Sequence, residues 1–204
     1  MFIRTEQKAA TRARILETAR KQLERDGYDG TSIRSVAGEA KVAAGTVLLH
    51  FRDKQDLLHA ALFDDLETTW ARAREVSEKK MQKKGSLERA LTALARAFFD
   101  YYAERPALSR ALLRESLFAA PPWSQRFAAQ VAEVHAHVAQ LAGAAKSRGE
   151  LEADVDVALL GAAFFSFYYF ALMAWLQGGH AHPLQFFERL LRQHLDGLAP
   201  RRKR

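Results

Sequence analysis

The sequence predicts an all-α protein of about nine helices, in which a small N-terminal helical unit precedes a larger helical bundle. Apolar residues recur at steps of three and four along most of the chain, which is the period of an amphipathic helix. Glycine and proline residues interrupt this period where helices are expected to end. No stretch has the clean period-two alternation of a strand, and no internal repeat is visible. A length of 204 residues is enough for one or two domains with a real core.

The first expected helix has an apolar stripe that repeats every four residues and stops at Gly27. Its stripe is formed by Ile15, Ala19 and Leu23. Two short helices follow, over 33–40 and 44–50, with a tight turn at Lys41-Val42 between them. Together they have helix-turn-helix spacing over about 33–52. A short helical hairpin without a DNA-reading role shows the same pattern and remains an alternative at this point.

The larger part of the chain predicts six further helices. Asp53 has the place of an N-cap, with Asp56 three positions on where a capping-box acid is expected, and the helix runs to about Met81. A lysine run and Gly85 then suit a helix C-terminus. Breaks at the later glycines and prolines divide the remainder into helices over about 86–102, 106–118, 124–148, 154–177 and 184–198.

Composition and charge exclude several classes of protein. There are no cysteines, which excludes a disulfide scaffold and thiolate metal sites. The N-terminal residues lack the apolar run of a secretory signal, so a cytoplasmic location is expected. The net charge of +7 is concentrated in residues 1–54, with 11 Lys/Arg against 7 Asp/Glu, and in the basic tail 201–204. Such ends can hold a polyanion, although for the tail we favour a solvated, disordered terminus.

One apolar segment, 157–179, is long enough to raise the question of a membrane span. Tyr168 and Tyr169 lie at its centre, whereas membrane helices place tyrosines at the interfaces. We therefore expect a helix of a soluble bundle and no membrane partner. Small residues at four-residue spacing would let a dimer partner approach this helix closely: Ala158, Ala162 and Ser166.

The segment from Thr11 to Leu58 resembles the DNA-binding domain of the TetR family of bacterial transcriptional repressors. The matching motifs occur in order, and the resemblance covers roughly the first third of the chain. They are Arg-x-x-Ile-Leu at 12–16, Gly27-Tyr28, Thr31-Ser32-Ile33, Val36-Ala37, Ala40, Val42, Gly45-Thr46-Val47, His50-Phe51, Lys54 and Leu57.

The resemblance implies a domain division and a set of DNA contacts. Residues 1–54 would form the helix-turn-helix DNA-binding domain, and 55–200 a helical ligand-binding and dimerisation domain. Contacts with double-stranded operator DNA would come from Thr31, Ser32, Arg34, Ala43, Ala44, Gly45, Thr46, Leu48, Leu49, His50 and Lys54. The hydroxyls and free backbone N–H groups at Thr31 and Ser32 would hold a phosphate, and His50 and Lys54 resemble the family's phosphate contacts. We expect Leu48 to be exposed and Leu49 partly buried.

The segment departs from the family pattern at three positions, and two of these departures reduce the polar groups on the reading helix. Leu48 replaces the usual tyrosine, and Ala44 replaces a frequent polar or basic residue. Lys41 stands where glycine is common, and a left-handed conformation there costs roughly 1 kcal/mol. Leucine and alanine can still pack on thymine methyl groups. We therefore expect more phosphate positioning and fewer polar base contacts than is usual.

The resemblance further implies a homodimer through the eighth and ninth helices. The expected interface residues are Ala158, Ala162, Ser166, Phe187 and Leu191. The second domain is also rich in aromatic residues, which favours a small apolar, aromatic or acyl effector that releases a repressor from its operator. The candidate pocket walls are Trp70, Phe98, Tyr102, Phe118, Trp123, Phe127 and Tyr168.

Neither a catalytic site nor a metal site is expected. No acid pair, nucleophile–base set or glycine-rich phosphate loop stands out, and the histidines are poorly spaced for a metal. We therefore predict no enzyme activity and no cofactor. The alternative is a helical small-molecule-binding protein or enzyme that has lost DNA reading, for which Leu48 and Ala44 are the only support.

Overall fold

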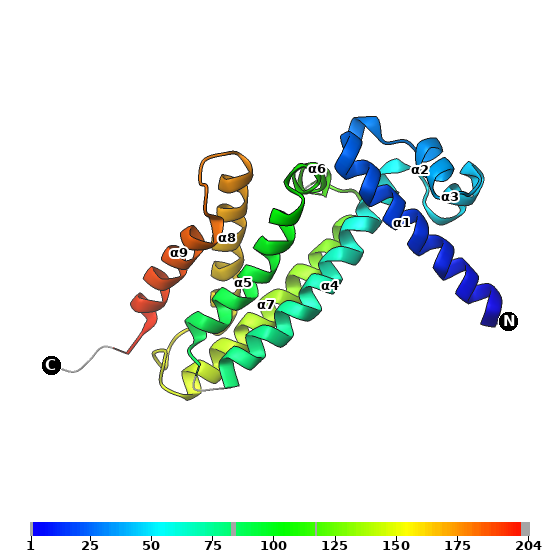
Figure 1. Cartoon of the computed structure of the whole chain (residues 1–204). Helices are drawn as coiled ribbons and strands as arrows, with labels where there is room; N and C mark the ends of the chain where they lie inside the picture. Colours follow the sequence, from blue (N-terminus) through cyan, green and yellow to red (C-terminus); the bar gives the residue numbers. More distant parts are fainter. Residues whose placement is uncertain (1, 83–84, 117, 201–204) are drawn as a thin grey trace. The chain divides into compact units, whose positions relative to one another are not determined.

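The computed structural model describes residues 2–82, 85–116 and 118–200, and within them the chain forms nine helices and no strands (Figure 1). This confirms the all-α prediction. The helices are α1 (Phe2–Gly30), α2 (Ile33–Glu39), α3 (Ala44–His50), α4 (Lys54–Gln82), α5 (Leu87–Glu104), α6 (Pro106–Ser116), α7 (Trp123–Ser147), α8 (Val157–Leu176) and α9 (Pro183–Leu198). The basic tail, 201–204, lies outside the described residues.

The chain folds into two compact units, and the first is discontinuous in sequence. Unit 1 comprises Met1–Leu66 and Arg105–Gln125, while unit 2 comprises Glu67–Glu104 and Arg126–Arg204. Unit 1 therefore contains α6 and the start of α7 in addition to α1, α2, α3 and the first turns of α4. The predicted DNA-binding segment, 1–54, falls inside unit 1, and its functional boundary stays a prediction.

The core of unit 1 is built on the predicted apolar stripe of α1. Ile15, Ala19 and Leu23 are buried, together with Phe51 and Leu58. Helix α1 also packs against α6, and Arg105 reaches Glu24 at 3.5 Å. Burial of α1 by α6 explains why α6, which begins 76 positions after the end of α1, belongs to this unit.

Helix α1 is longer than its apolar stripe. It begins at Phe2, and its regular run breaks at Gly27, where φ is 71°. Glycine is suited to this left-handed conformation because it has no Cβ atom. The predicted stop at Gly27 is therefore a break, after which a short helical turn continues to Gly30.

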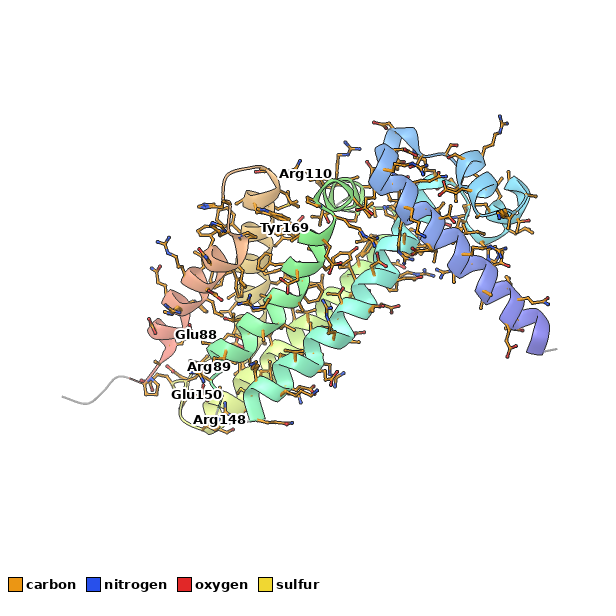
Figure 2. All side chains as sticks on the ribbon, in the orientation of Figure 1. Glu88, Arg89, Arg110, Arg148, Glu150 and Tyr169 are labelled. Atoms are coloured by element: carbon orange, nitrogen blue, oxygen red, sulfur yellow. The ribbon has the colours of Figure 1, made fainter. Side chains whose placement is uncertain are left out.

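In unit 2, α8 packs on α9 and α5, and α9 packs on α5. Phe164 and Phe187 are fully buried at this junction, with ring centroids 5.4 Å apart. At the end of the bundle where α5 begins, Glu150 accepts a hydrogen bond from the backbone N–H of Leu87 at 2.9 Å. Arg148 donates to the same carboxylate and to the carbonyl of Met81 at the end of α4 (Figure 2).

Helix α8 is apolar around its whole circumference but is not buried around it. Among the described residues it is the one helix long and apolar enough to cross a membrane, and only 33% of its most apolar window is buried within the subunit. Leu159 is 67% exposed and Phe170 is 58% exposed. The subunit thus leaves a large apolar surface on α8 uncovered.

Candidate nucleic-acid interface

Helices α2 and α3 form a compact pair that packs on α1. Val36, Ala37, Ala40 and Val47 are buried where the helices meet. The backbone N–H of Val42 donates to the carbonyl of Ala37 at 2.9 Å, which closes the turn between the helices. Small side chains at the contact allow the close approach that a helix-turn-helix requires.

Lys41 holds the turn in a left-handed conformation. Its φ is 54°, and among the described residues it is the one non-glycine with a positive φ. Its backbone N–H donates to the carbonyl of Gly38 at 3.2 Å. The expected cost of about 1 kcal/mol is therefore present in the folded state, and the packing of α2 on α3 has to offset it.

The outward face of α3 is made of small and aliphatic side chains. Ala43, Ala44 and Gly45 are exposed at its start. Leu48 is 51% exposed and Leu49 is 81% exposed, so the prediction that Leu49 is partly buried is wrong. Val47 alone fills the core position of this turn, and both leucines therefore lie on the surface.

The start of α2 is held by hydroxyl groups, but these bind the protein itself. The exposed Ser32 is the N-cap, and its Oγ accepts from the backbone N–H of Ser35 at 3.0 Å. Thr31 is buried, and its hydroxyl donates to the carbonyl of Gly27 at 2.8 Å. The prediction that the Thr31 hydroxyl contacts a phosphate is therefore wrong, because that hydroxyl is buried and bonded within the fold. Arg34, in the first turn of α2, is exposed.

Two basic side chains, Lys54 and His50, flank the end of α3. Lys54 is half-buried, with its Nζ 3.9 Å from the centroid of the Tyr28 ring. This contact with an aromatic face fixes the direction of the ammonium group. His50 is also half-buried, and its pKa is lowered by burial and by the charges of Lys8 and Arg12. Arg12 in turn lies over the Phe51 ring at 5.5 Å.

Lys8, Arg12 and Arg52 were not among the predicted contact residues. Lys8 and Arg12 are four positions apart on α1, a spacing that places both on one helix face. That spacing is visible in the sequence, but the position of the Lys8 and Arg12 side chains beside α3 depends on the packing of α1. Arg52 is exposed directly after α3, and its Nη2 lies 3.6 Å from Asp56 Oδ1.

The predicted pocket residues divide between the two units. In unit 2, Phe98, Tyr102 and Tyr168 join one buried aromatic cluster, in which Phe98 and Tyr168 have centroids 5.8 Å apart. The hydroxyls of Tyr102 and Tyr168 are hydrogen-bonded to each other, and burial raises the pKa of both phenols. Trp70, also in unit 2, donates from its indole N–H to Glu133 at 3.0 Å. Phe127 is half-buried on α7.

Two other predicted pocket residues belong to unit 1. Phe118 is 91% exposed, so its assignment to a pocket wall is wrong, because no packing holds its ring in the interior. Trp123 is buried, and its indole N–H donates to Asp56 Oδ1 at 2.7 Å. This bond holds the Trp123 side chain to α4 within unit 1.

The predicted dimer residues also fall into two groups. Phe187 and Leu191 are fully buried on the side of α9 that faces its own subunit, so their assignment to a dimer interface is wrong. Ala158 and Ser166 are exposed and Ala162 is half-buried on α8. The opposite side of α9 lines an open depression of about 350 Å³, formed by Phe186, Arg189, Leu190, Arg192, Gln193 and Asp196.

The histidines of α7 have separate environments. The ring of His135 meets Phe165 at 5.4 Å, while His137 Nε2 lies 2.9 Å from the Ser77 hydroxyl. In the part of the chain that the structure describes, no group of three or more His, Asp or Glu side chains is placed to hold a metal ion.

Comparison with known proteins identifies both parts of the chain. Residues 15–61 match the family described as bacterial regulatory proteins, tetR family, and residues 81–193 match the tetracyclin repressor-like C-terminal domain. The HTH-type transcriptional regulator UidR of Escherichia coli strain K12 is 34% identical over 68 residues. That match covers 33% of this chain and 35% of UidR, about a third of each protein.

Solved structures match over nearly the whole length. A TetR transcription regulator from Haloarcula marismortui superposes with a TM-score of 0.77 at 20% identity, covering 94% of this chain and all of that one. Thermus thermophilus FadR, a TetR-family repressor in complex with lauroyl-CoA, gives a TM-score of 0.72 at 21% identity over 94% of this chain and 97% of FadR. At these identities the structures show a shared fold. Because the C-terminal match alone spans more than half of the residues, the chain belongs to the TetR family of bacterial regulatory proteins.

Proposed function

We propose that this protein is a transcriptional repressor that binds operator DNA as a homodimer and releases it when a small apolar, aromatic or acyl effector binds. The observation that carries the proposal is the surface of α3, where Ala44, Gly45, Leu48 and Leu49 stand exposed on a short helix beside cationic side chains. A cytoplasmic location follows from this function. Regulators of this family are generally not enzymes, and we propose no catalytic role.

The docking we propose places α3 in the major groove. The two exposed leucines and the alanines would pack on thymine methyl groups, while Arg34, His50 and Lys54 would hold the backbone on either side. Arg52, Lys8 and Arg12 add positive charge near the end of α3. In this arrangement, contacts with phosphates would contribute more to the DNA affinity than polar contacts with bases would.

The dimer contact we propose uses the uncovered sides of α8 and α9. Leu159 and Phe170 supply apolar area on α8, and Ala158 and Ser166 are small enough for another helix to approach. The outer side of α9 contributes a mainly polar border with Arg189, Arg192 and Asp196. An apolar centre with a polar rim is the usual composition of a stable interface.

The effector class is proposed from the buried aromatic cluster of unit 2 and from the lauroyl-CoA bound to Thermus FadR. Phe127 and Trp70 are half-buried aromatic side chains of this unit and are the candidates to touch such a ligand. Lauroyl-CoA and simple aromatic acids are suitable first probes in a thermal-shift assay. Absence of stabilisation by either class would contradict the proposed effector chemistry.

The direct test of DNA binding is a mobility-shift assay on the DNA upstream of this gene, with Lys54→Ala as the first variant. We expect operator affinity to fall several-fold and the salt slope to flatten by about 1, because one phosphate contact is lost. Affinity for unrelated DNA should fall similarly. Lys79→Ala, at an exposed site on α4 in unit 2, is the matched control. An unchanged isotherm for Lys54→Ala would contradict the docking, and no shift by the wild type would favour the DNA-independent alternative.

Operator binding should also depend on pH through His50. Its pKa is lowered in the free protein by burial and two nearby cations, whereas DNA phosphates would stabilise the charged imidazolium. Binding therefore takes up a proton, and affinity should rise as pH falls from about 7.5 to about 5.5. His50→Gln should remove this rise. Identical pH profiles for the two proteins, measured by fluorescence anisotropy at constant ionic strength, would exclude His50 from the phosphate contact.

A further inference from the structure

We infer that Trp123 is a positioning residue for DNA binding, acting through Asp56 on the backbone that follows the reading helix. The inference rests on the proposed function of α3. Trp123 donates its indole N–H to Asp56 Oδ1 at 2.7 Å. The other oxygen, Oδ2, accepts the backbone N–H of Arg52 at 2.9 Å. A side chain from the start of α7 is thereby connected to the residue two positions beyond α3.

Asp56 was expected to complete a capping box at the start of α4, and the structure gives it a different partner. Its backbone N–H donates to Asp53 Oδ1 at 2.7 Å, as an N-cap interaction requires. Its own carboxylate reaches Arg52 rather than the backbone of Asp53. The backbone N–H of Asp56 therefore caps the start of α4, while its carboxylate fixes the connection between α3 and α4.

The connection that Asp56 holds determines how α3 ends. Phe51 is the C-cap of α3, with an extended backbone, and its N–H donates to the carbonyl of Val47. Its ring is buried. With Phe51 held by the core on one side and Arg52 by Asp56 on the other, the C-terminal turn of α3 cannot rotate without breaking one of these contacts. Leu48, Leu49 and His50 all lie on that turn.

The hydrogen bonds to Asp56 are between a charged acceptor and neutral donors. Burial would raise the pKa of this carboxyl, but the bonds from the Arg52 backbone and the Trp123 indole, with the Arg52 charge, outweigh burial and lower the pKa. Asp56 is therefore ionised at neutral pH. Hydrogen bonds to an ionised acceptor are stronger than those between neutral groups. Loss of the indole N–H should therefore weaken the orientation of the Asp56 carboxylate and its hydrogen bond with the Arg52 amide.

Other contacts fix the Trp123 ring independently of its N–H. His59 and Phe63 of α4 each lie with ring centroids 5.8 Å from it. His59 Nε2 is 3.2 Å from the carbonyl of Glu115 on α6. A phenylalanine at position 123 keeps an aromatic ring in this pocket while removing the donor. The N–H can therefore be tested separately from the packing.

The first measurement is amide hydrogen exchange by NMR on Trp123→Phe in the absence of DNA. We expect the Arg52 amide to exchange about 10-fold faster, since Asp56 loses the second donor that orients it. Trp175→Phe makes the same substitution in unit 2, whereas Arg52 lies in unit 1, and should leave exchange at Arg52 unchanged. Unchanged exchange at Arg52 in Trp123→Phe would overturn the inference whatever the DNA result.

The second measurement is operator affinity in a double-mutant cycle with Asp56→Ala. We expect Trp123→Phe to weaken binding about 10-fold and to have no further effect when Asp56 is already alanine. Additive losses would overturn the inference, because Trp123 would then act by another route. If Asp56→Ala does not fold, Asp56→Asn replaces it, since one amide oxygen cannot hold both donors in the same way.

The two measurements separate failure of the inference from failure of the proposed function. A wild-type protein that binds upstream DNA, with Trp123→Phe binding equally well, overturns the positioning role alone. A wild-type protein that binds no upstream DNA overturns the proposed function and the positioning role with it.

Discussion

Replacing both Leu159 and Phe170 by glutamate is expected to convert the dimer that we propose into a monomer and to reduce operator affinity at least about 100-fold. Both side chains lie on α8 and are more than half exposed. Four carboxylates at the centre of a symmetric interface would lose their hydration without gaining cationic partners. A monomer holds a single reading helix and cannot bind two half-sites together.

Light scattering coupled to size-exclusion chromatography measures the mass, and a mobility shift measures the affinity. Val76→Glu is the matched control, because Val76 is an exposed apolar side chain on α4. It should remain dimeric and bind DNA normally. A double variant that stays dimeric would show that the subunits meet elsewhere. A wild-type protein that sediments with membranes after lysis would instead indicate that lipid covers α8.

Gly161→Ala is expected to destabilise the protein by about 1–3 kcal/mol. A Cβ atom at position 161 would lie 2.8 Å from the backbone oxygen of His135 and 3.2 Å from its Cα. Both are main-chain atoms of α7, so no side-chain rotation can relieve the overlap. The helices α7 and α8 would have to separate, and the packing around Phe164 and Leu160 would loosen.

Gly143→Ala supplies the comparison for this substitution. Gly143 lies inside α7, and a Cβ there would meet no atom within 4 Å. We expect this variant to be more stable by about 0.5–1 kcal/mol, since alanine loses less backbone entropy in a helix than glycine. Urea unfolding of the two variants should therefore give shifts of opposite sign. Shifts of the same size and sign would mean that α7 and α8 do not approach at Gly161.

The helices could be predicted from the sequence because each leaves a local signal. The stripe of Ile15, Ala19 and Leu23 gave the buried face of α1, and Gly27 gave its break. Lys41 was identified as the residue in a glycine position, and its backbone has the expected left-handed conformation. The stripe and its break depend on neighbours in sequence, and the helical period carries that information directly, whereas the Lys41 prediction came from the resemblance to the family pattern.

The errors occurred where a side chain's neighbour comes from a distant part of the chain. Leu48 and Leu49 are adjacent apolar residues, and only the packing of α3 shows that Val47 occupies the core position for both. Phe187 and Leu191 form an apolar stripe on α9 that suits either a dimer or a core. The contact of α9 with α5 and α8 assigns them to the core.

Thr31 illustrates a third kind of error, in which one residue type serves two purposes. A hydroxyl at the start of a helix can hold a phosphate or can satisfy the fold's own backbone. The break at Gly27 leaves a carbonyl that Thr31 binds, and Ser32 takes the cap alone. The position of Trp123 beside Asp56 gives no local signal either, because 67 residues separate them.

The discontinuity of unit 1 limits how this protein can be divided or recombined. A fragment that ends at Leu66 would lack the α6 residues that cover α1 and the tryptophan that holds Asp56. A chimaera that joins residues 1–66 of this protein to the ligand-binding domain of another regulator would contain the α6 of that other regulator. The segment Arg105–Gln125 must therefore be transferred together with the N-terminal segment that ends at Leu66, because both belong to unit 1.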